Sequence, residues 1–86
     1  MSNPNKNSVI AQRKRLLERL HKQPCTTIQA RHELDVLQPA PRVFELRHNH
    51  GYNIVTHWCY EKNPGGGSHR IARYTLLPGT WDRGVK

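Results

Sequence analysis

The stretch "PAPRVFELRHNHGYNIVTHWCYE", residues 39–61, changes its hydrophobic period at Gly51. Before the glycine, Val43 and Leu46 have the spacing of a buried helix face. After it, β-branched and aromatic residues dominate, which indicates a strand. Gly51 suits the end of a helix because glycine adopts the left-handed conformation without a steric penalty. The stretch therefore predicts a helix over residues 39–50 that is followed directly by a strand.

Two further helices are predicted upstream of this stretch. In residues 8–24, Ser8 is a candidate N-cap, leucines follow at helical spacing, and Pro24 ends the segment. Thr26 and Gln29 have the T-x-x-Q spacing of a capping box, in which each side chain satisfies a backbone N–H of the other residue. This spacing predicts a second, short helix of about eight residues.

A β-hairpin is predicted downstream. The run "RIARYTL", residues 70–76, is rich in β-forming residues and follows residues 52–61 across a loop with three consecutive glycines. The loop lacks the G-x-x-x-x-G-K-[ST] spacing and the following helix of a nucleotide-binding loop. Residues two apart share one face of a strand. The residues expected to face the core are Ile54, Ala72, Tyr74 and Leu76.

Three helices followed by a hairpin is the order of a winged helix-turn-helix domain. The blocks "QRKRLLERL", "TTIQARHELDV", "RVFELRHNHGYNI" and "ARYTL" also resemble a family of small winged helix-turn-helix domains common in bacteriophage and prophage genomes. The strongest part, Arg42-Val43, Glu45-Leu46-Arg47 and Gly51-Tyr52-Asn53-Ile54, is similar to the R-I-x-E-L-R…G-Y-x-I of that family. The resemblance covers roughly residues 12–76. It implies an α+β fold with a two-stranded antiparallel wing, a DNA-binding third helix and no enzymatic activity.

The chain departs from the general helix-turn-helix pattern in the turn before the third helix. Asp35 stands where such turns often have glycine. The turn either holds Asp35 in the left-handed region, which Asp tolerates better than most residues, or takes another shape. Pro39 suits the first position of the third helix, because its missing N–H would have no partner there.

A chain of 86 residues has room for one domain, which we place at residues 8–77, between flexible tails at 1–7 and 78–86. No apolar run approaches the roughly 20 residues of a membrane span, and the N-terminus has no signal-peptide core, so we expect a cytoplasmic protein without membrane contact. Cys25 and Cys59 are expected to be reduced thiols.

The charge of the chain favours a polyanionic partner. Fourteen Lys and Arg against six Asp and Glu give a net charge of +8. Cations that neutralise phosphates release counterions, so double-stranded DNA is the first candidate partner, although the same charge could serve solubility alone. The candidate DNA-contacting residues are Thr26, Thr27, Gln38, Arg42, Arg47, His48, Lys62, His69, Arg70 and Arg73.

A helical wheel divides the third helix into two faces. Val43, Leu46 and His50 point towards the core, and Phe44 points away from it. Three interpretations of Phe44 stay open. It contacts a thymine methyl group, it marks a protein interface, or it packs against one of the first two helices.

The remaining residue types do not form a recognisable catalytic or metal site. No His or Cys pair has zinc-finger spacing, Ser68 next to His69 does not place a base on a nucleophile, and the carboxylates form no acid–base pair. We therefore expect no metal, cofactor or catalysis. The alternative function is an adaptor that docks on a host or phage protein through Phe44, Trp58 or Trp81, and RNA binding ranks third. No heptad pattern predicts an oligomeric state.

Overall fold

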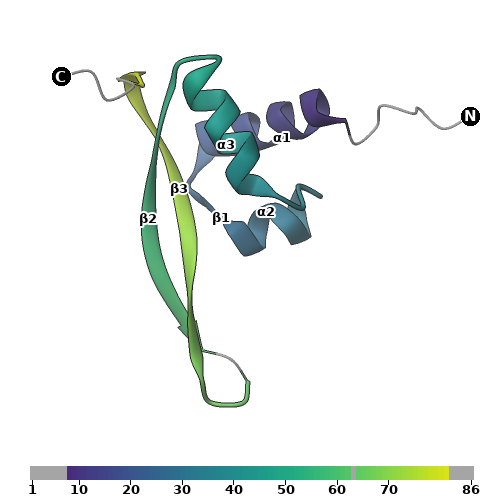
Figure 1. The fold of residues 1–86 in the computed structure, drawn as a ribbon, viewed down its shortest axis with the longest axis vertical. Coiled ribbons are helices and arrows are strands. Elements are labelled where there is room, and N and C mark those ends of the chain that lie inside the picture. Colours follow the sequence, from purple (N-terminus) through teal and green to yellow (C-terminus); the bar gives the residue numbers. More distant parts are fainter. Residues whose placement is uncertain (1–7, 63, 82–86) are drawn as a thin grey trace, which may run out of the picture.

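The computed structural model describes residues 8–62 and 64–81 of the chain. The elements are, in order, α1 (Val9–Lys22), β1 (Cys25–Thr26), α2 (Thr27–Glu33), α3 (Pro39–His48), β2 (Tyr52–Lys62) and β3 (Ser68–Thr80). β2 and β3 form a long hairpin, and the helices pack on one side of it (Figure 1). The end of the hairpin that carries its turn projects beyond the helices. The tail expected at residues 1–7 lies outside the described residues.

Both predicted helix caps are confirmed. Ser8 Oγ accepts a hydrogen bond from the Ala11 N–H at 3.2 Å and begins α1. In α2, Thr26 Oγ1 accepts from the Gln29 N–H at 3.0 Å, and Gln29 Oε1 accepts from the Thr26 N–H at 3.1 Å. The caps satisfy N–H groups of the first turn that have no partner within the helix.

Two residues in the left-handed conformation set the path of the chain on either side of α3. Asp35 has a φ of 57°, so the turn before α3 holds an aspartate in this region, the first of the two predicted alternatives. Val36 follows it and is fully buried. α3 begins at Pro39, as predicted. It is closed by Gly51, which has a φ of 77° and whose N–H donates to the Arg47 carbonyl at 3.0 Å.

The core face of α3 is shorter than the wheel predicted. Val43 and Leu46 are buried, at 1% and 3% exposure, but His50 is exposed, so its predicted core position is wrong. α3 ends at His48, and the chain turns before Gly51. The angular spacing of a helix therefore no longer applies at residue 50.

The sheet has three strands in the order β1-β3-β2, one more than the predicted hairpin. The additional strand, β1, pairs antiparallel with β3 and places Cys25 opposite Tyr74 and Thr26 opposite Arg73. A strand of two residues has no hydrophobic period of its own, so the sequence pattern did not reveal it. It joins the link between α1 and α2 to the hairpin.

The hairpin contributes to the core as predicted. Ile54, Ala72 and Tyr74 are at most 5% exposed, and Leu76 packs against the core from a partly buried position. They meet buried residues from all three helices, including Leu16, Leu20, Ala30, Val43 and Leu46. β3 continues to Thr80, so residues 78–80, which the sequence analysis assigned to a tail, belong to the strand.

Candidate nucleic-acid interface

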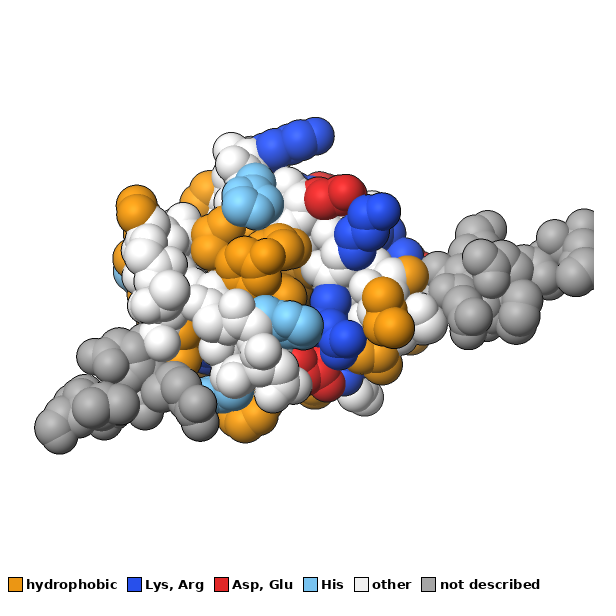
Figure 2. Space-filling model, turned by 90° about the horizontal axis from the view of Figure 1, so that it is seen from above, with side chains coloured by type: hydrophobic (Ala, Val, Ile, Leu, Met, Phe, Trp, Pro, Cys, Tyr) orange, Lys and Arg blue, Asp and Glu red, His pale blue; other side chains and the backbone are white. Residues whose placement is uncertain are grey.

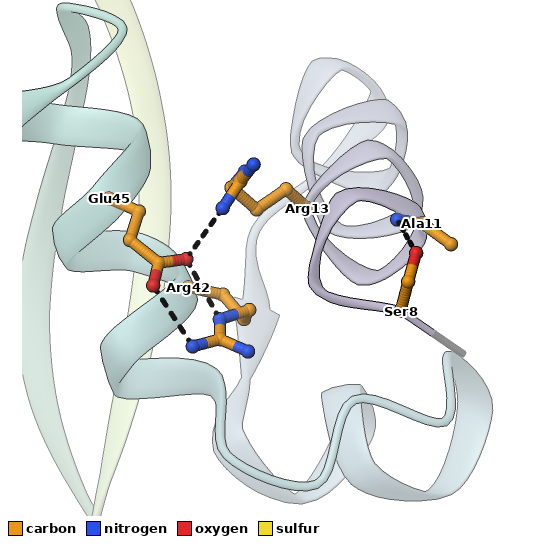
Figure 3. A network of polar contacts seen from close by, with 5 residues as sticks. All are labelled: Ser8, Ala11, Arg13, Arg42 and Glu45. Atoms are coloured by element: carbon orange, nitrogen blue, oxygen red, sulfur yellow. Dashed lines mark hydrogen bonds and ion pairs between the residues drawn. The ribbon is translucent and has the colours of Figure 1, made fainter. Parts of the chain in front are cut away.

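Glu45 of α3 holds two arginines. Its carboxylate accepts a hydrogen bond at 3.0 Å from Arg13 Nη1 of α1 and another at 3.0 Å from Arg42 Nη2 (Figure 3). Arg42 Nε lies 3.0 Å from the same carboxylate. The side chains of Arg13, Arg42 and Glu45 are only 22%, 14% and 24% exposed, so the contacts are partly shielded from water. The cluster joins α3 to α1, and it occupies Arg42, a candidate DNA contact.

Arg47 joins α3 to the hairpin. Its Nε donates to the Ile54 carbonyl at 2.6 Å, and its Nη2 donates to Thr56 Oγ1 at 2.7 Å. The guanidinium carbon lies 4.6 Å from the centre of the Trp81 ring. Burial lowers the pKa of the Arg47 guanidinium, but arginine remains protonated in proteins, so the charge stays available for both bonds. This candidate DNA contact is thus also occupied within the protein.

The outer side of α3 carries aromatic rings. Phe44 is 59% exposed, and its ring centre lies 4.2 Å from that of His48, one turn further along α3. His48 in turn meets the Trp81 ring edge-on at 6.1 Å. Since Phe44 is mainly exposed, the predicted alternative of packing against α1 or α2 does not hold. The DNA and protein interpretations of Phe44 stay open.

The candidate residues around α2 differ in how free their side chains are. Thr26 is used in the capping box, and Thr27 Oγ1 donates to the Ala72 carbonyl at 3.4 Å. Gln38 is the N-cap residue of α3, but its side chain makes no capping bond and is exposed. Of the three, Gln38 is the residue best placed to reach a ligand at the start of α3.

The hairpin presents its candidate cations to solvent. Lys62, His69, Arg70 and Arg73 are all exposed. Arg70 lies opposite Tyr60 in the β2–β3 register, so it shares a face with Tyr60 and Trp58. Its guanidinium carbon sits 4.3 Å from the centre of the Trp58 ring. His69 and Arg73 occupy alternate positions and project from the other face.

A hollow of about 420 Å³ lies between α2, the start of α3 and the hairpin. It is lined by Thr27, Ile28, Arg31, Ala40, Trp58, His69, Arg70, Ile71, Ala72 and Tyr74. None of these described lining residues is acidic, and two are arginines. The hollow is therefore positively charged and has an aromatic wall, which is a suitable surface for a nucleic acid.

Other kinds of site receive no support from the part of the chain that the structure describes. Within residues 8–62 and 64–81, no helix is long and apolar enough to cross a membrane, and no three His, Cys, Asp or Glu residues are grouped as metal ligands. Cys25 and Cys59 are free thiols, as expected. Burial raises the pKa of the Cys25 thiol, which keeps it in the protonated, unreactive form.

A comparison with protein families decides the identity of this architecture. A family model described as a winged helix-turn-helix domain matches residues 11–78. The chain belongs to this family. Comparisons with curated proteins and with solved structures gave no match. The predicted fold class is confirmed, with α2 and α3 in the places of the helix-turn-helix and the β2–β3 hairpin in the place of the wing.

Winged helix-turn-helix domains are DNA-binding domains, so the family indicates DNA binding for this chain. In this winged domain, His69 and Arg70 line the hollow, whereas Arg42 and Arg47 are held by groups of the protein itself. Gln38 is exposed two residues before the lining residue Ala40. Arg31 also lines the hollow, and its Nε donates to the Leu37 carbonyl at 3.0 Å while the residue stays exposed. Arg31 and Trp58 were not among the DNA contacts predicted from the sequence. The sequence does point to Arg31, because residues four apart lie on the same face of a helix and Thr27 was a predicted contact. Trp58 becomes recognisable only when the strand register places it beside Arg70.

Proposed function

We propose that this winged helix-turn-helix domain binds double-stranded DNA as a phage-type regulator or accessory factor of transcription, excision or replication. The observation that carries the proposal is the hollow beside the start of α3, which Arg31 and Arg70 both line and whose described lining contains no acidic residue. Cations gathered on a concave surface attract a phosphate backbone over several ångströms.

The first turn of the recognition helix and the wing share the contact in this proposal. Gln38 and Ala40 are exposed at the start of α3, where side chains are free to approach base edges in the major groove. Lys62, Arg70 and Arg73 of the wing are exposed and long enough to reach phosphates on the flanking backbone.

Arg42 and Arg47 have a positioning role in this proposal. Direct contact with DNA would require Arg42 to leave Glu45, or Arg47 to leave the Ile54 carbonyl. Charge-assisted bonds of this kind are short and roughly twice as strong as neutral ones. Both arginines therefore fix the orientation of α3, and the exposed side chains around it make the contacts.

A titration with random duplex DNA at several salt concentrations tests the proposal. Four to six phosphate contacts predict that log K falls with log salt concentration with a slope of about −4 to −5. Fluorescence anisotropy of a labelled duplex measures the affinity. A flat salt response, or no binding at low salt, would contradict DNA binding.

A second candidate function, a protein-interaction adaptor, is favoured by a different surface. Two adjoining hollows of about 400 and 240 Å³ share Tyr52 near the base of the wing, and their walls include Ile10, Leu17 and Leu20. Figure 2 shows hydrophobic side chains in the middle of this end of the molecule, with charged side chains mainly above them and on their right. Binding through apolar surface is not weakened by salt, so the same titration separates the two functions.

A further inference from the structure

The wing exposes two aromatic side chains that the core does not need. Trp58 and Tyr60 are 57% and 73% exposed, and they lie two residues apart on one face of β2. Neither belongs to the buried core or to the residues packed against it. Exposed aromatic side chains of this size on a basic surface mark a site of contact.

Cations alternate with the aromatic rings on this face. Lys62 follows Tyr60 by two residues, and Arg70 lies opposite Tyr60 and over one face of the Trp58 ring. The only acidic residue within the two described wing strands, Glu61, occupies the alternate position opposite His69. Proteins that bind single-stranded nucleic acid use this combination, in which cations follow the backbone and aromatic rings stack on the bases.

The surroundings of Trp58 provide room for a base. Its side chain forms part of the wall of the hollow of about 420 Å³, together with Arg31 and Ala40 of the helix-turn-helix. This volume lies within the range of about 300–1,000 Å³ that is typical of small-ligand sites. A nucleotide in the hollow would have the Trp58 ring beside its base and the cations Arg31 and Arg70 within the same lining to face its phosphate.

The bases of paired DNA are not free to stack on the Trp58 ring. Within a duplex, the faces of each base are covered by the neighbouring base pairs, and enzymes that need access to a base must take it out of the stack. An unpaired nucleotide offers both of its faces. The exposed ring of Trp58 is therefore better matched to unpaired bases than to a continuous duplex.

We propose that the Trp58 face of the wing is a stacking platform for unpaired DNA bases. The domain then binds the junction between a duplex and a single strand more tightly than a fully paired duplex. The duplex part of this inference rests on the proposed function, whereas the stacking part does not. The competing explanation is that Trp58, Tyr60 and Arg70 only stabilise the hairpin through cross-strand contacts.

Fluorescence of Trp58 tests the stacking directly. The chain has two tryptophans, so in the variant Trp81→Phe the emission excited selectively from tryptophan comes from Trp58 alone. Three probes are compared, namely an oligo-dT strand, a duplex with an unpaired oligo-dT tail, and the same duplex with blunt ends. We expect quenching by the first two and much less by the third. Equal quenching by tailed and blunt duplexes would overturn the proposal, and tighter binding of oligo-U than of oligo-dT would overturn the assignment to DNA.

Affinities of matched variants complete the test. Trp58→Leu is expected to weaken binding of the tailed duplex about fivefold or more, and to change binding of the blunt duplex less than about twofold. Trp58→Phe, which keeps a ring, is expected to restore most of the difference. Phe44→Leu is the control, because Phe44 is equally exposed, at 59%, but lies on α3. It should not change the preference for the tail.

The outcomes separate this inference from the proposed function. If the parent binds tailed and blunt duplexes equally well, the proposed stacking platform is rejected, and the proposed binding of double-stranded DNA is retained. If the parent binds oligo-dT but no blunt duplex, the proposed binding of double-stranded DNA is rejected, and the proposed stacking platform is retained. Equal losses for both duplexes in Trp58→Leu, with Trp58→Phe behaving like the parent, would show a purely structural role for the ring and overturn the platform.

Discussion

At the scale of single residues, the arginines of α3 show that charge and exposure are separate properties. Arg47 is on the recognition helix, yet its guanidinium is bonded to the Ile54 carbonyl and Thr56 of the wing. Arg73, on the wing, is exposed to solvent. A cation of the first kind sets the angle between α3 and the wing, and one of the second kind is available to a phosphate.

This difference leads to a prediction about stability. Arg47→Ala should lower the free energy of unfolding by about 1–3 kcal/mol, because it leaves a partly buried carbonyl without its donor. Urea denaturation followed by circular dichroism measures the change. The matched control is Arg73→Ala, which should stay within about 0.5 kcal/mol of the parent. Equal losses in the two variants would show that the hydrogen bond to the Ile54 carbonyl does not contribute measurably to the free energy of unfolding.

Single residues also show where sequence reasoning succeeds. Ser8, Thr26 with Gln29, and Gly51 act on backbone groups within a few positions of themselves, so their roles were predicted correctly. Arg13 and Glu45 are 32 positions apart, and their contact depends on how α1 crosses α3. No local pattern contains that angle, so the contact of Arg13 with Glu45 could not be predicted. The pairing of Arg42 with Glu45 was within reach, because the two residues are three apart on one helix.

At the scale of elements, the wing has more exposed Lys and Arg side chains than any of the three helices over the residues that the structure describes. We expect the simultaneous change of Lys62, Arg70 and Arg73 to alanine to weaken duplex binding and to reduce the steepness of the salt slope by about 2–3. Anisotropy titrations at several salt concentrations measure both effects, and far-UV circular dichroism checks that the fold is retained.

The control for this variant removes cations from a different element. Lys14 and Lys22 are exposed on α1, and their joint change to alanine should leave the slope unchanged. If the wing variant keeps the slope of the parent, the cations of the wing only protect an edge strand from aggregation, as charged residues often do. α3 would then carry the binding alone.

The elements also show which parts of the fold the sequence predicts. The helices and the hairpin have clear periods, and their order was sufficient for the winged architecture. β1 and the hollow were not predicted, because both arise where α2 approaches the wing. Thr27 bonded to the Ala72 carbonyl illustrates this, since the two residues are 45 positions apart. The functional surface is therefore less predictable than the fold that supports it.

At the scale of the whole molecule, the net charge of +8 acts on folding as well as on binding. Excess charge of one sign destabilises a compact state through self-repulsion, and salt screens this repulsion. We expect the melting temperature of the free protein to rise by about 2–4 °C between low and moderate sodium chloride, while DNA affinity falls over the same range. Thermal melts followed by circular dichroism provide the measurement.

A fall in the melting temperature with increasing salt would contradict this prediction. Salt also weakens ion pairs such as Arg19 with Glu33, whose side chains are 13% and 53% exposed. A melting temperature that falls with salt would show that these pairs outweigh the general repulsion. The wing variant without three cations is the control, because it should respond less to salt than the parent.

The short strand β1 has a consequence for the rate at which the chain folds. Its two residues pair with Tyr74 and Arg73, almost fifty positions later in the chain. Closing so long a loop costs conformational entropy before the new contacts compensate for it, whereas the three helices form from neighbouring residues. We therefore expect the helices to begin to form early, and the pairing of β3 with Cys25 to be the slower step that completes the core.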